Sequence, residues 1–277
     1  MELTTSSNLS WVGRLRYIQA VCEPRERRGP DNLVRHFFPV LDRWRYRFVS
    51  TKELAKLRSE PFYYYLLART RYYDEVFREA ICDNVQYIIN VGCGSDTRAH
   101  RFGHALKQRG TEVLECDQPE AISVKRRVAK RLGPAEHIQY LSIDLNDDAW
   151  PSFEQWLNGI GSAKVMVMME GVSMYVNDEN FGRFLNLLGT VLAPGTLVAY
   201  DYKLRGVSDN LGRVGRTVTP FRLPPSTELA IAYHKKRGFR VTHVELSSEL
   251  EARLLPDVAD SGTPLFREDA LVQLQVQ

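Results

Sequence analysis

The chain has 277 residues, of which 44% are hydrophobic, and its formal net charge is +3. This length and apolar content suffice for one α/β domain with a sizeable core and a smaller appended cap. The small net charge does not indicate a nucleic-acid-binding protein. No apolar run approaches the roughly 18 to 20 residues of a membrane-spanning helix. We therefore expect neither nucleic acid nor a membrane as a partner.

The first ten residues are polar and lack the basic-then-apolar pattern of a secretory signal. Four cysteines are scattered through the sequence without a CxxC pair. Cys93 and Cys116 lie at expected strand ends, where a free thiol behaves as a small hydrophobic group. These features predict a protein of the reducing cytoplasm.

Residues 1–83 are rich in arginine and aromatic residues, with few strand signals. Apolar side chains recur there at intervals of three and four residues, which predicts a helical N-terminal cap. Between Arg14 and Arg47, nine arginines stand against four acidic residues. This excess of positive charge indicates either solvated helix faces or a docking face for an anionic partner, such as a carrier-protein-tethered or carboxylate substrate.

Residues 84–277 alternate short apolar runs with helical stretches, which predicts a parallel, doubly wound α/β sheet with ligands at the carboxyl ends of its strands. The clearest helix runs from Asp178 to Leu192 and ends before Pro194-Gly195. A segment rich in glycine, proline and arginine, Leu204–Pro225, is expected to form a long loop over that edge of the sheet. The expected strands are Tyr87–Val91, Glu112–Cys116, Ile138–Ser142, Lys164–Met169, Leu197–Tyr202, Phe239–Glu245 and Ala270–Gln275.

The turn Gly92-Cys93-Gly94 follows the first strand and precedes a helix, so its backbone can approach a ligand closely. A dinucleotide fingerprint requires a third glycine where this chain has Thr97. Asp96 would repel a diphosphate but suits an ammonium group, as in the methionyl part of S-adenosylmethionine, and it can also cap the helix. The pattern therefore favours S-adenosylmethionine over a nicotinamide dinucleotide.

Acidic residues follow the next three strands in order. Asp117 lies 23 residues after Gly94, close to the roughly 20 expected for an acid that binds ribose hydroxyls. Asp144 can accept from an adenine amino group while Leu145 packs on the ring, although an aspartate there also suits a turn. Glu170 ends a strongly apolar strand and must lie at the mouth of the sheet, which indicates a functional role.

Four segments carry a family resemblance: Ala68-Arg69-Thr70-Arg71, Asn90 to Arg98, Glu115 to Pro119, and Met169 to Val176. They resemble the leucine carboxyl methyltransferase-like family, which includes O-methyltransferases of polyketide and peptide natural products. The resemblance runs from about Pro30 to Leu192. It implies a Rossmann-like class I methyltransferase with a seven-stranded, mostly parallel sheet, helices on both faces and a helical N-terminal cap.

The resemblance also implies S-adenosylmethionine as the cofactor and roles for the matching residues. Arg69 would pair with the methionyl carboxylate, a task that suits a guanidinium group. Gly92 and Gly94 would line the methionyl part, and Glu170, mainly through its backbone, would lie beside the ammonium and methyl groups. Asp117 would hold the ribose, and Asp144 with Leu145 the adenine.

Two residues are candidates on the substrate side. Tyr175 follows Glu170 at the carboxyl edge, where it either meets the acceptor or packs in the helix-entry turn. His234 is either a base or a solvated surface residue. No metal site is predicted, because His100 and His104, four residues apart, have no third ligand nearby.

The sequence thus predicts an O-methyltransferase acting on a hydroxyl or carboxylate of a small-molecule, natural-product acceptor. Methylation of a partner protein's C-terminal carboxylate is an alternative, and so is a non-catalytic S-adenosylmethionine-binding module. Nucleic-acid methylation through the arginine-rich stretch ranks last, since that stretch contains no recognisable nucleic-acid module. The sequence carries no signal for an oligomeric state.

Overall fold

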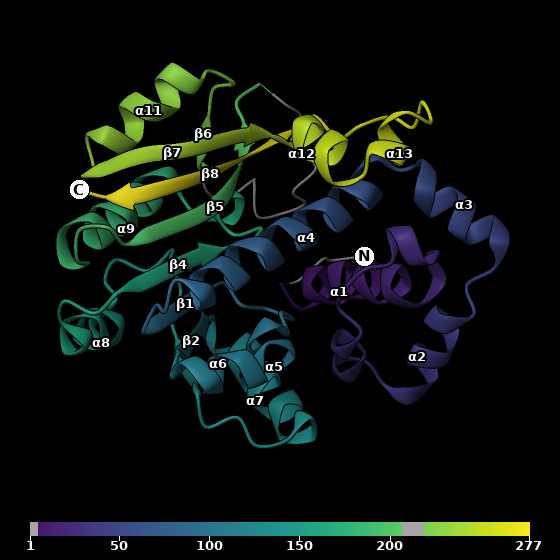
Figure 1. Ribbon diagram of the computed structural model, residues 1–277, viewed down its shortest axis with the longest axis horizontal. Coiled ribbons are helices and arrows are strands. Elements are labelled where there is room, and N and C mark those ends of the chain that lie inside the picture. The colour runs from purple at the N-terminus through teal and green to yellow at the C-terminus, as the bar shows by residue number, and fades with distance from the viewer. Residues whose placement is uncertain (1–4, 207–218) are drawn as a thin grey trace.

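The computed structural model describes residues 5–206 and 219–277, with side chains from residue 11 onward (Figure 1). Helices and strands alternate after a helical N-terminal region. The α-helices are α1 (Thr5–Cys22), α2 (Val40–Arg47), α3 (Thr51–Ser59), α4 (Pro61–Cys82), α5 (Arg98–Arg101), α6 (Gly103–Arg109), α7 (Pro119–Leu132), α8 (Pro151–Ile160), α9 (Asp178–Val191), α11 (Thr227–Lys235), α12 (Ser247–Leu254) and α13 (Pro256–Ala259). Three short 3₁₀ helices are η1 (Arg25–Arg27), η2 (Leu33–Phe37) and η3 (Ser173–Tyr175).

The strands form one mixed sheet in the order β3-β2-β1-β4-β5-β8-β7. The neighbours from β3 to β5 pair in parallel, whereas β8 is antiparallel to both β5 and β7. The chain reverses direction across the sheet between β1 and β4, which creates the switch point where ligands bind in such sheets. The strands are β1 (Tyr87–Val91), β2 (Glu112–Asp117), β3 (Ile138–Ser142), β4 (Val165–Met169), β5 (Leu197–Leu204), β6 (Arg222–Leu223), β7 (Phe239–Leu246) and β8 (Asp269–Val276).

The α/β prediction is confirmed, with a small difference in the strands. All seven predicted strands are present, and β6 adds a two-residue strand that pairs with the end of β5. The predicted loop Leu204–Pro225 is therefore strand at both of its described ends, and Phe221 is fully buried in the core. Residues 207–218 of that loop lie outside the described residues.

Both faces of the central strands are buried, as their continuous apolar sequences require. Along β4, Met166 and Met168 belong to one hydrophobic cluster, while Val165, Val167 and Met169 belong to the other. The methionine side is covered by α4, α6 and α12, and the valine side by α8, α9 and α11. The alternation of side chains along a strand divides the core into these two layers.

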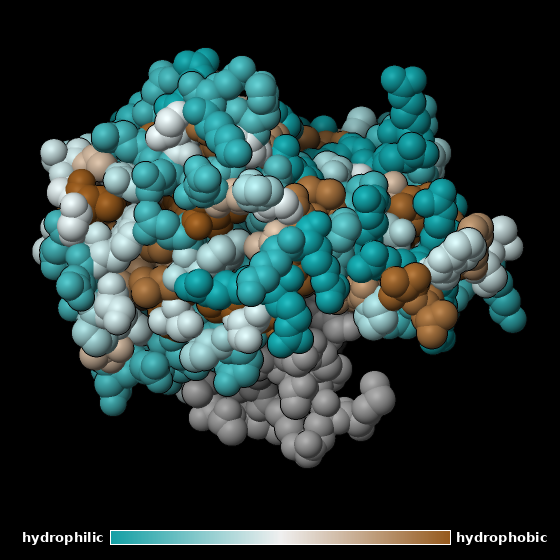
Figure 2. Space-filling view, turned by 90° about the horizontal axis from the view of Figure 1, so that it is seen from below, coloured by the Kyte–Doolittle hydropathy of each residue, from teal (hydrophilic) through white to brown (hydrophobic). Residues whose placement is uncertain are grey.

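The helical N-terminal region lies at one end of the molecule (Figure 1). Its last helix, α4, shares a hydrophobic cluster with the sheet, and α1 packs against α4 and η2. On the face shown in Figure 2, hydrophobic side chains also reach the surface at the end where α2 and α3 lie. The boundary predicted at residue 83 follows the end of α4.

We predict that Gly189→Ala, in α9, destabilises the fold by about 1 to 3 kcal/mol. A Cβ atom at Gly189 would lie 2.2 Å from the backbone oxygen of Arg237, so α9 could not keep its contact with the turn before β7. Chemical denaturation measures the change in free energy of unfolding.

Gly159→Ala is the matched control in α8. A Cβ atom there meets nothing within 4 Å, so the substitution should stabilise the protein by roughly 0.5 to 1 kcal/mol through helix propensity alone. Equal effects of the two substitutions would contradict the packing of α9 described above.

Candidate active site

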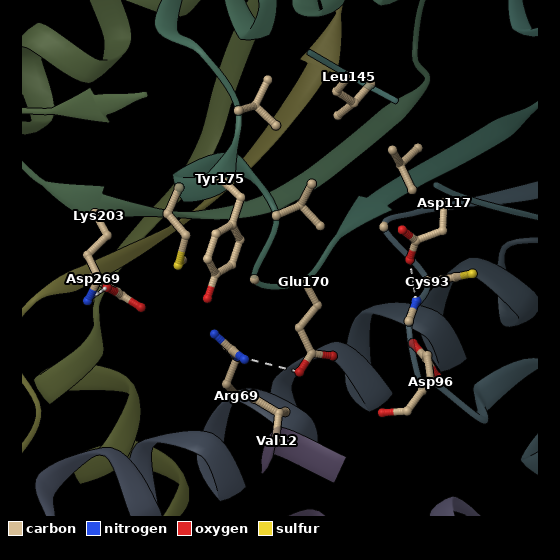
Figure 3. A pocket seen from close by; sticks show the side chains of 18 of the residues that line it. Val12, Arg69, Cys93, Asp96, Asp117, Leu145, Glu170, Tyr175, Lys203 and Asp269 are labelled. Atoms are coloured by element: carbon tan, nitrogen blue, oxygen red, sulfur yellow. Dashed lines mark hydrogen bonds and ion pairs between the residues drawn. The ribbon is translucent and has the colours of Figure 1, made fainter. Parts of the chain in front are cut away.

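A cavity of about 880 Å³ lies at the carboxyl edge of the sheet, at the switch point between β1 and β4. Its walls come from the segments after β1, β2, β3 and β4, from the end of β5, and from α1 and α4. Figure 3 shows Asp117 and Cys93 on one side of Glu170, and Tyr175, Lys203 and Asp269 on the other. The cavity is therefore an extended site with two ends.

The glycine turn lies against the segment that follows β4. Gly92 has φ +69°, and a Cβ atom on it would approach Val172 Cγ2 to 2.2 Å, so only glycine fits. The Cys93 amide donates to the carbonyl of Cys116 at 3.0 Å, which ties the turn to β2. The turn thereby forms a close-fitting floor for the cavity.

Asp117 ends β2 and faces this turn. Its Oδ2 accepts from the Gly94 amide at 2.7 Å, and its Oδ1 accepts from the Gln118 amide at 2.8 Å. Burial raises the pKa of the carboxyl, which these two donors oppose. Because an ionised carboxylate has about four acceptor positions, two remain for a ligand.

Asp144 and Leu145 follow β3 and also line the cavity. Asp144 Oδ2 accepts from Gln118 Nε2 at 2.7 Å, and Oδ1 accepts from the Asn146 amide at 2.9 Å. Leu145 is buried in the core cluster that continues under the sheet. The structure thus brings a carboxylate and an apolar side chain together, next to Asp117 through their shared neighbour Gln118.

Arg69 and Glu170 meet in the middle of the cavity (Figure 3). Arg69 Nε lies 3.4 Å from Glu170 Oε1, and Nη1 donates to Asp201 Oδ2 at 3.2 Å. Asp201 also accepts from the Gly171 amide at 2.7 Å and from the Tyr73 hydroxyl at 3.0 Å. Burial raises the pKa of Asp201 to about 6, although Arg69 opposes that shift.

Arg98, the first residue of α5, is completely buried among carboxylates. Its guanidinium donates to Asp74 at 2.7 Å, Asp96 at 2.6 Å and Glu170 at 2.7 Å, and to the Thr70 carbonyl at 3.0 Å. Although burial opposes it, Arg98 helps to hold the pKa values of Asp96 and Glu170 below their usual range. Asp96, for which the sequence suggested an ammonium ligand or a helix cap, is thus bound by Arg98. Its Oδ1 also accepts from the Arg98 amide at 2.7 Å, although the N-cap residue of α5 is Thr97.

The ion pairs continue into the N-terminal region. Arg16 of α1 lies 3.7 Å from both Asp31 and Glu170, and Asp31 also accepts from the Thr97 hydroxyl at 2.5 Å. Arg101 of α5 donates to both oxygens of Asp74 in α4. We call Arg16, Arg69, Arg98, Arg101, Asp31, Asp74, Asp96, Glu170 and Asp201 the buried ion-pair network. It joins α1, α4 and α5 to the ends of β4 and β5.

Most residues of the buried ion-pair network were not predicted from the sequence. Arg98 lies in one of the four segments that carry the family resemblance, but no role was predicted for it. Asp201 could have been recognised, because it is an acidic residue inside an otherwise apolar strand. Arg16 and Asp31 lie in the arginine-rich stretch, where nothing in the local pattern separates a buried arginine from a solvated one.

The other end of the cavity has aromatic walls and a cluster of charged side chains. Tyr175 lines it, together with Phe266 and Lys203. Lys203 Nζ lies 2.8 Å from Glu268 Oε2 and 3.1 Å from Asp269 Oδ1, and 4.8 Å from the centroid of the Phe266 ring. This end can receive an aromatic or apolar molecule that carries a polar group.

The structure places His234 away from this cavity, among buried side chains. Its Nδ1 lies 2.5 Å from the Ala230 carbonyl and must donate to it, so Nε2 accepts from the Tyr200 hydroxyl at 2.5 Å. His234 is thus neither solvated nor part of the cavity lining, because its side chain points from α11 into the core.

The aromatic residues of α4 divide between core and cavity. Phe62 lines the cavity, whereas the five tyrosines of this run, Tyr63, Tyr64, Tyr65, Tyr72 and Tyr73, are buried in the core.

We predict that Arg98→Met lowers the free energy of unfolding by about 3 to 5 kcal/mol, because it leaves buried carboxylates without their common partner. Arg27→Met removes a solvent-exposed ion pair with Asp257 and should cost less than about 1 kcal/mol. Denaturant unfolding of both variants at neutral pH makes the comparison. A loss for Arg98→Met as small as the loss for Arg27→Met would contradict the role of the network.

We also predict a pH dependence of stability from His234, whose pKa burial lowers to about 4. The unfolded chain takes up this proton near pH 6.5, and the folded chain only near pH 4. The free energy of unfolding therefore decreases as the pH is lowered through this window. Between pH 7 and pH 5 the contribution is about 2 kcal/mol. His234→Gln should reduce the change in the free energy of unfolding between pH 7 and pH 5 by that amount. A variant that keeps the full wild-type change would contradict this assignment.

The sequence matches one protein family and several named proteins. The family described as leucine carboxyl methyltransferase matches residues 18–189. A protein of Mycolicibacterium smegmatis, named "Putative S-adenosyl-L-methionine-dependent methyltransferase", is 32% identical over 139 residues, 50% of this chain and 45% of that protein. A protein of the same description from Mycobacterium tuberculosis is 28% identical over 157 residues, 56% of this chain and 49% of that protein. The chain spans about half the length of the curated relatives it matches.

Solved structures of methyltransferases are more distant. Magnesium protoporphyrin IX methyltransferase from Synechocystis PCC 6803, with bound SAH, has 13% sequence identity and a TM-score of 0.49, covering 89% of this chain and 99% of that chain. An S-adenosylmethionine-dependent methyltransferase from Mesorhizobium loti has 16% identity and a TM-score of 0.45, covering 71% of this chain and 96% of that one.

The names of the relatives specify S-adenosylmethionine, the cofactor that the sequence predicts. The family match covers more than half of the chain and includes the glycine turn and the residues after β2, β3 and β4. The resemblance of the motifs is thereby confirmed, and the protein belongs to the leucine carboxyl methyltransferase family.

Proposed function

We propose that the protein is an S-adenosylmethionine-dependent O-methyltransferase that acts on a hydroxyl or carboxylate of a small-molecule acceptor of the natural-product type. The charge of the cavity carries this proposal. Among the described residues, seven acidic and three basic side chains line it: Glu60, Asp96, Asp117, Asp144, Glu170, Glu268 and Asp269, with Arg16, Arg69 and Lys203. Such a lining favours a ligand with excess positive charge, and S-adenosylmethionine has a sulfonium and an ammonium group against one carboxylate.

The end of the cavity near the glycine turn fits the nucleoside half of this cofactor. Asp117 has two acceptor positions left, which match the two hydroxyls of a ribose. Asp144 and Leu145 are the groups for the adenine amino group and ring. Gly92 and Gly94 line the cavity with backbone atoms alone, beside the place that we assign to the methionyl part.

Arg69 and Glu170 are the groups for the methionyl end. Arg69 Nε is buried and lies 3.4 Å from Glu170 Oε1 without a hydrogen bond to any described residue, so the guanidinium keeps a donor for the methionyl carboxylate. The Glu170 side chain is directed to Arg98, so the part of Glu170 available to a methionyl ammonium is mainly its backbone.

Bound S-adenosylmethionine supplies an electrophilic methyl group next to a positively charged sulfur. The chain has to align the acceptor with that methyl group and exclude water from the cavity. Trp11, Phe62 and Phe266 provide apolar walls for this purpose. A carboxylate acceptor needs no base, whereas a hydroxyl acceptor must lose a proton.

Tyr175 and Lys203 are the polar groups that we assign to the acceptor end. Burial raises the pKa of Tyr175, so its hydroxyl stays protonated at neutral pH and can donate to an acceptor oxygen. Glu268, which Lys203 holds at 2.8 Å, is available to receive a proton there. An acceptor tethered to a carrier protein is compatible with this arrangement as long as its reactive group reaches that end.

We predict that the protein binds S-adenosylmethionine and that Asp117→Asn weakens binding roughly ten- to a hundredfold, through the lost charge and ribose contact. Asp147→Asn is the control, since Asp147 is exposed and is not part of the cavity lining. Isothermal titration calorimetry measures both affinities. Absence of binding by folded wild-type protein would overturn the proposal.

Transfer is tested separately, with S-adenosylmethionine labelled in the methyl group and sets of aromatic hydroxy and carboxylic acceptors. Label in a small molecule supports the proposal. Label at a protein C-terminus instead would identify a protein carboxyl methyltransferase, as the family description suggests. Cofactor binding without transfer to either class would indicate a non-catalytic binding module.

A further inference from the structure

The α2 helix exposes an unusual amount of hydrophobic surface. Val40, Leu41, Trp44 and Phe48 have exposed fractions of 62%, 84%, 62% and 65%. Their spacing places them along one side of the helix and its C-terminal end. We call these four residues the α2 patch. The surface in Figure 2 shows hydrophobic side chains at this end of the molecule.

The orientation of α2 is fixed by contacts of its opposite side. The Tyr46 ring packs edge-on against Phe38 at 5.3 Å, and the Arg14 guanidinium lies 5.2 Å from the same tyrosine ring. Arg43 Nε donates to the Phe38 carbonyl at 2.9 Å. Because Tyr46 anchors the inner side, the α2 patch is held facing outward.

Basic residues lie among and shortly after the residues of the α2 patch in the sequence. Residues 40–56 contain five basic residues and two acidic ones, and one of the acids, Glu53, is already paired with Arg14. Arg45 and Arg47 are exposed and form no ion pair within the described part of the chain. The surface therefore combines projecting apolar side chains with uncompensated positive charge.

We propose that the α2 patch docks the protein onto an anionic phospholipid surface. Tryptophan, phenylalanine and leucine on one side of a helix insert at the boundary between headgroups and acyl chains, while neighbouring arginines meet lipid phosphates. No helix in the described residues is long and apolar enough to cross a membrane, so this contact is peripheral. The proposal revises the expectation of no membrane partner, which considered spanning segments.

The shape of the surface favours lipid over a protein partner. Helix α2, which carries the exposed side chains of the α2 patch, lies at the outer edge of the molecule, near α3 and away from the sheet (Figure 1). An acidic protein would complement the arginines but would also need a groove matching four projecting side chains. A fluid lipid surface needs no such groove.

A second helix provides a matched control. Helix α11 exposes Leu229 and Ile231, with fractions of 54% and 43%, and also carries exposed Lys235 and Lys236. It has neither an exposed aromatic residue nor the density of arginines that surrounds the α2 patch. Substitutions on α11 therefore remove comparable apolar and basic groups from a surface that we do not assign to lipid.

The experiment is co-sedimentation of the full chain with phosphatidylcholine vesicles that contain or lack phosphatidylglycerol. We expect salt-sensitive binding to the anionic vesicles. Trp44→Ser with Phe48→Ser should weaken it at least about tenfold, and Arg45→Gln with Arg47→Gln by roughly as much. Leu229→Ser with Ile231→Ser, and Lys235→Gln with Lys236→Gln, should leave it unchanged.

Thermal unfolding and S-adenosylmethionine titration verify that each variant is folded, and they keep this test independent of the proposed reaction. Equal losses in the α2 and α11 variants would overturn the proposal, as would vesicle binding that ignores lipid charge. Self-association that depends on the α2 patch, without vesicle binding, would instead assign the surface to a second copy of the chain. Binding to an acidic carrier protein but not to anionic vesicles would likewise overturn the lipid assignment.

Discussion

Arg98 has no exposed surface, and its guanidinium is shared by carboxylates from α4, the glycine turn and the end of β4. Removing such charges from water costs several kcal/mol for each ion, which is recovered only when all partners take their places together. The buried charges therefore favour one relative position of α4, the glycine turn and the end of β4. Arg98 thus helps to fix the relative positions of the glycine turn, the end of β4 and the covering helix α4.

The cavity inherits this constraint. Glu170 is bound by Arg98 of α5 and lies near Arg16 of α1. Asp201 accepts from both Arg69 and the Gly171 amide, and so orients them. Because α1 contributes Trp11, Val12 and Arg16 to the cavity wall, the site is complete only when the N-terminal region is docked. The same buried charges thus organise both the fold and the electrostatic character of the site.

The parts of the site that could be predicted are those that follow strands in sequence order. Asp117 and Asp144 end or follow successive parallel strands, and such strands bring their carboxyl ends to one edge, so their meeting follows from topology. The pairing of Arg16 with Asp31 and Glu170 depends on how α1 docks, which no local pattern encodes. The burial of His234 could not be predicted, because the two residues that follow it, Lys235 and Lys236, are exposed lysines.

The position of β8 has a consequence for how the chain reaches its final state. This strand, which follows β7 in the sequence, lies between β5 and β7, and it pairs with both along nearly its whole length. When only the part of the chain up to β7 has left the ribosome, β7 has no strand to pair with. The edge of β5 that later pairs with β8 is then without a hydrogen-bonding partner. Asp269, at the start of β8, also lines the cavity. Closure of the sheet and completion of the site therefore both require β8 to take its place, through contacts between distant parts of the chain.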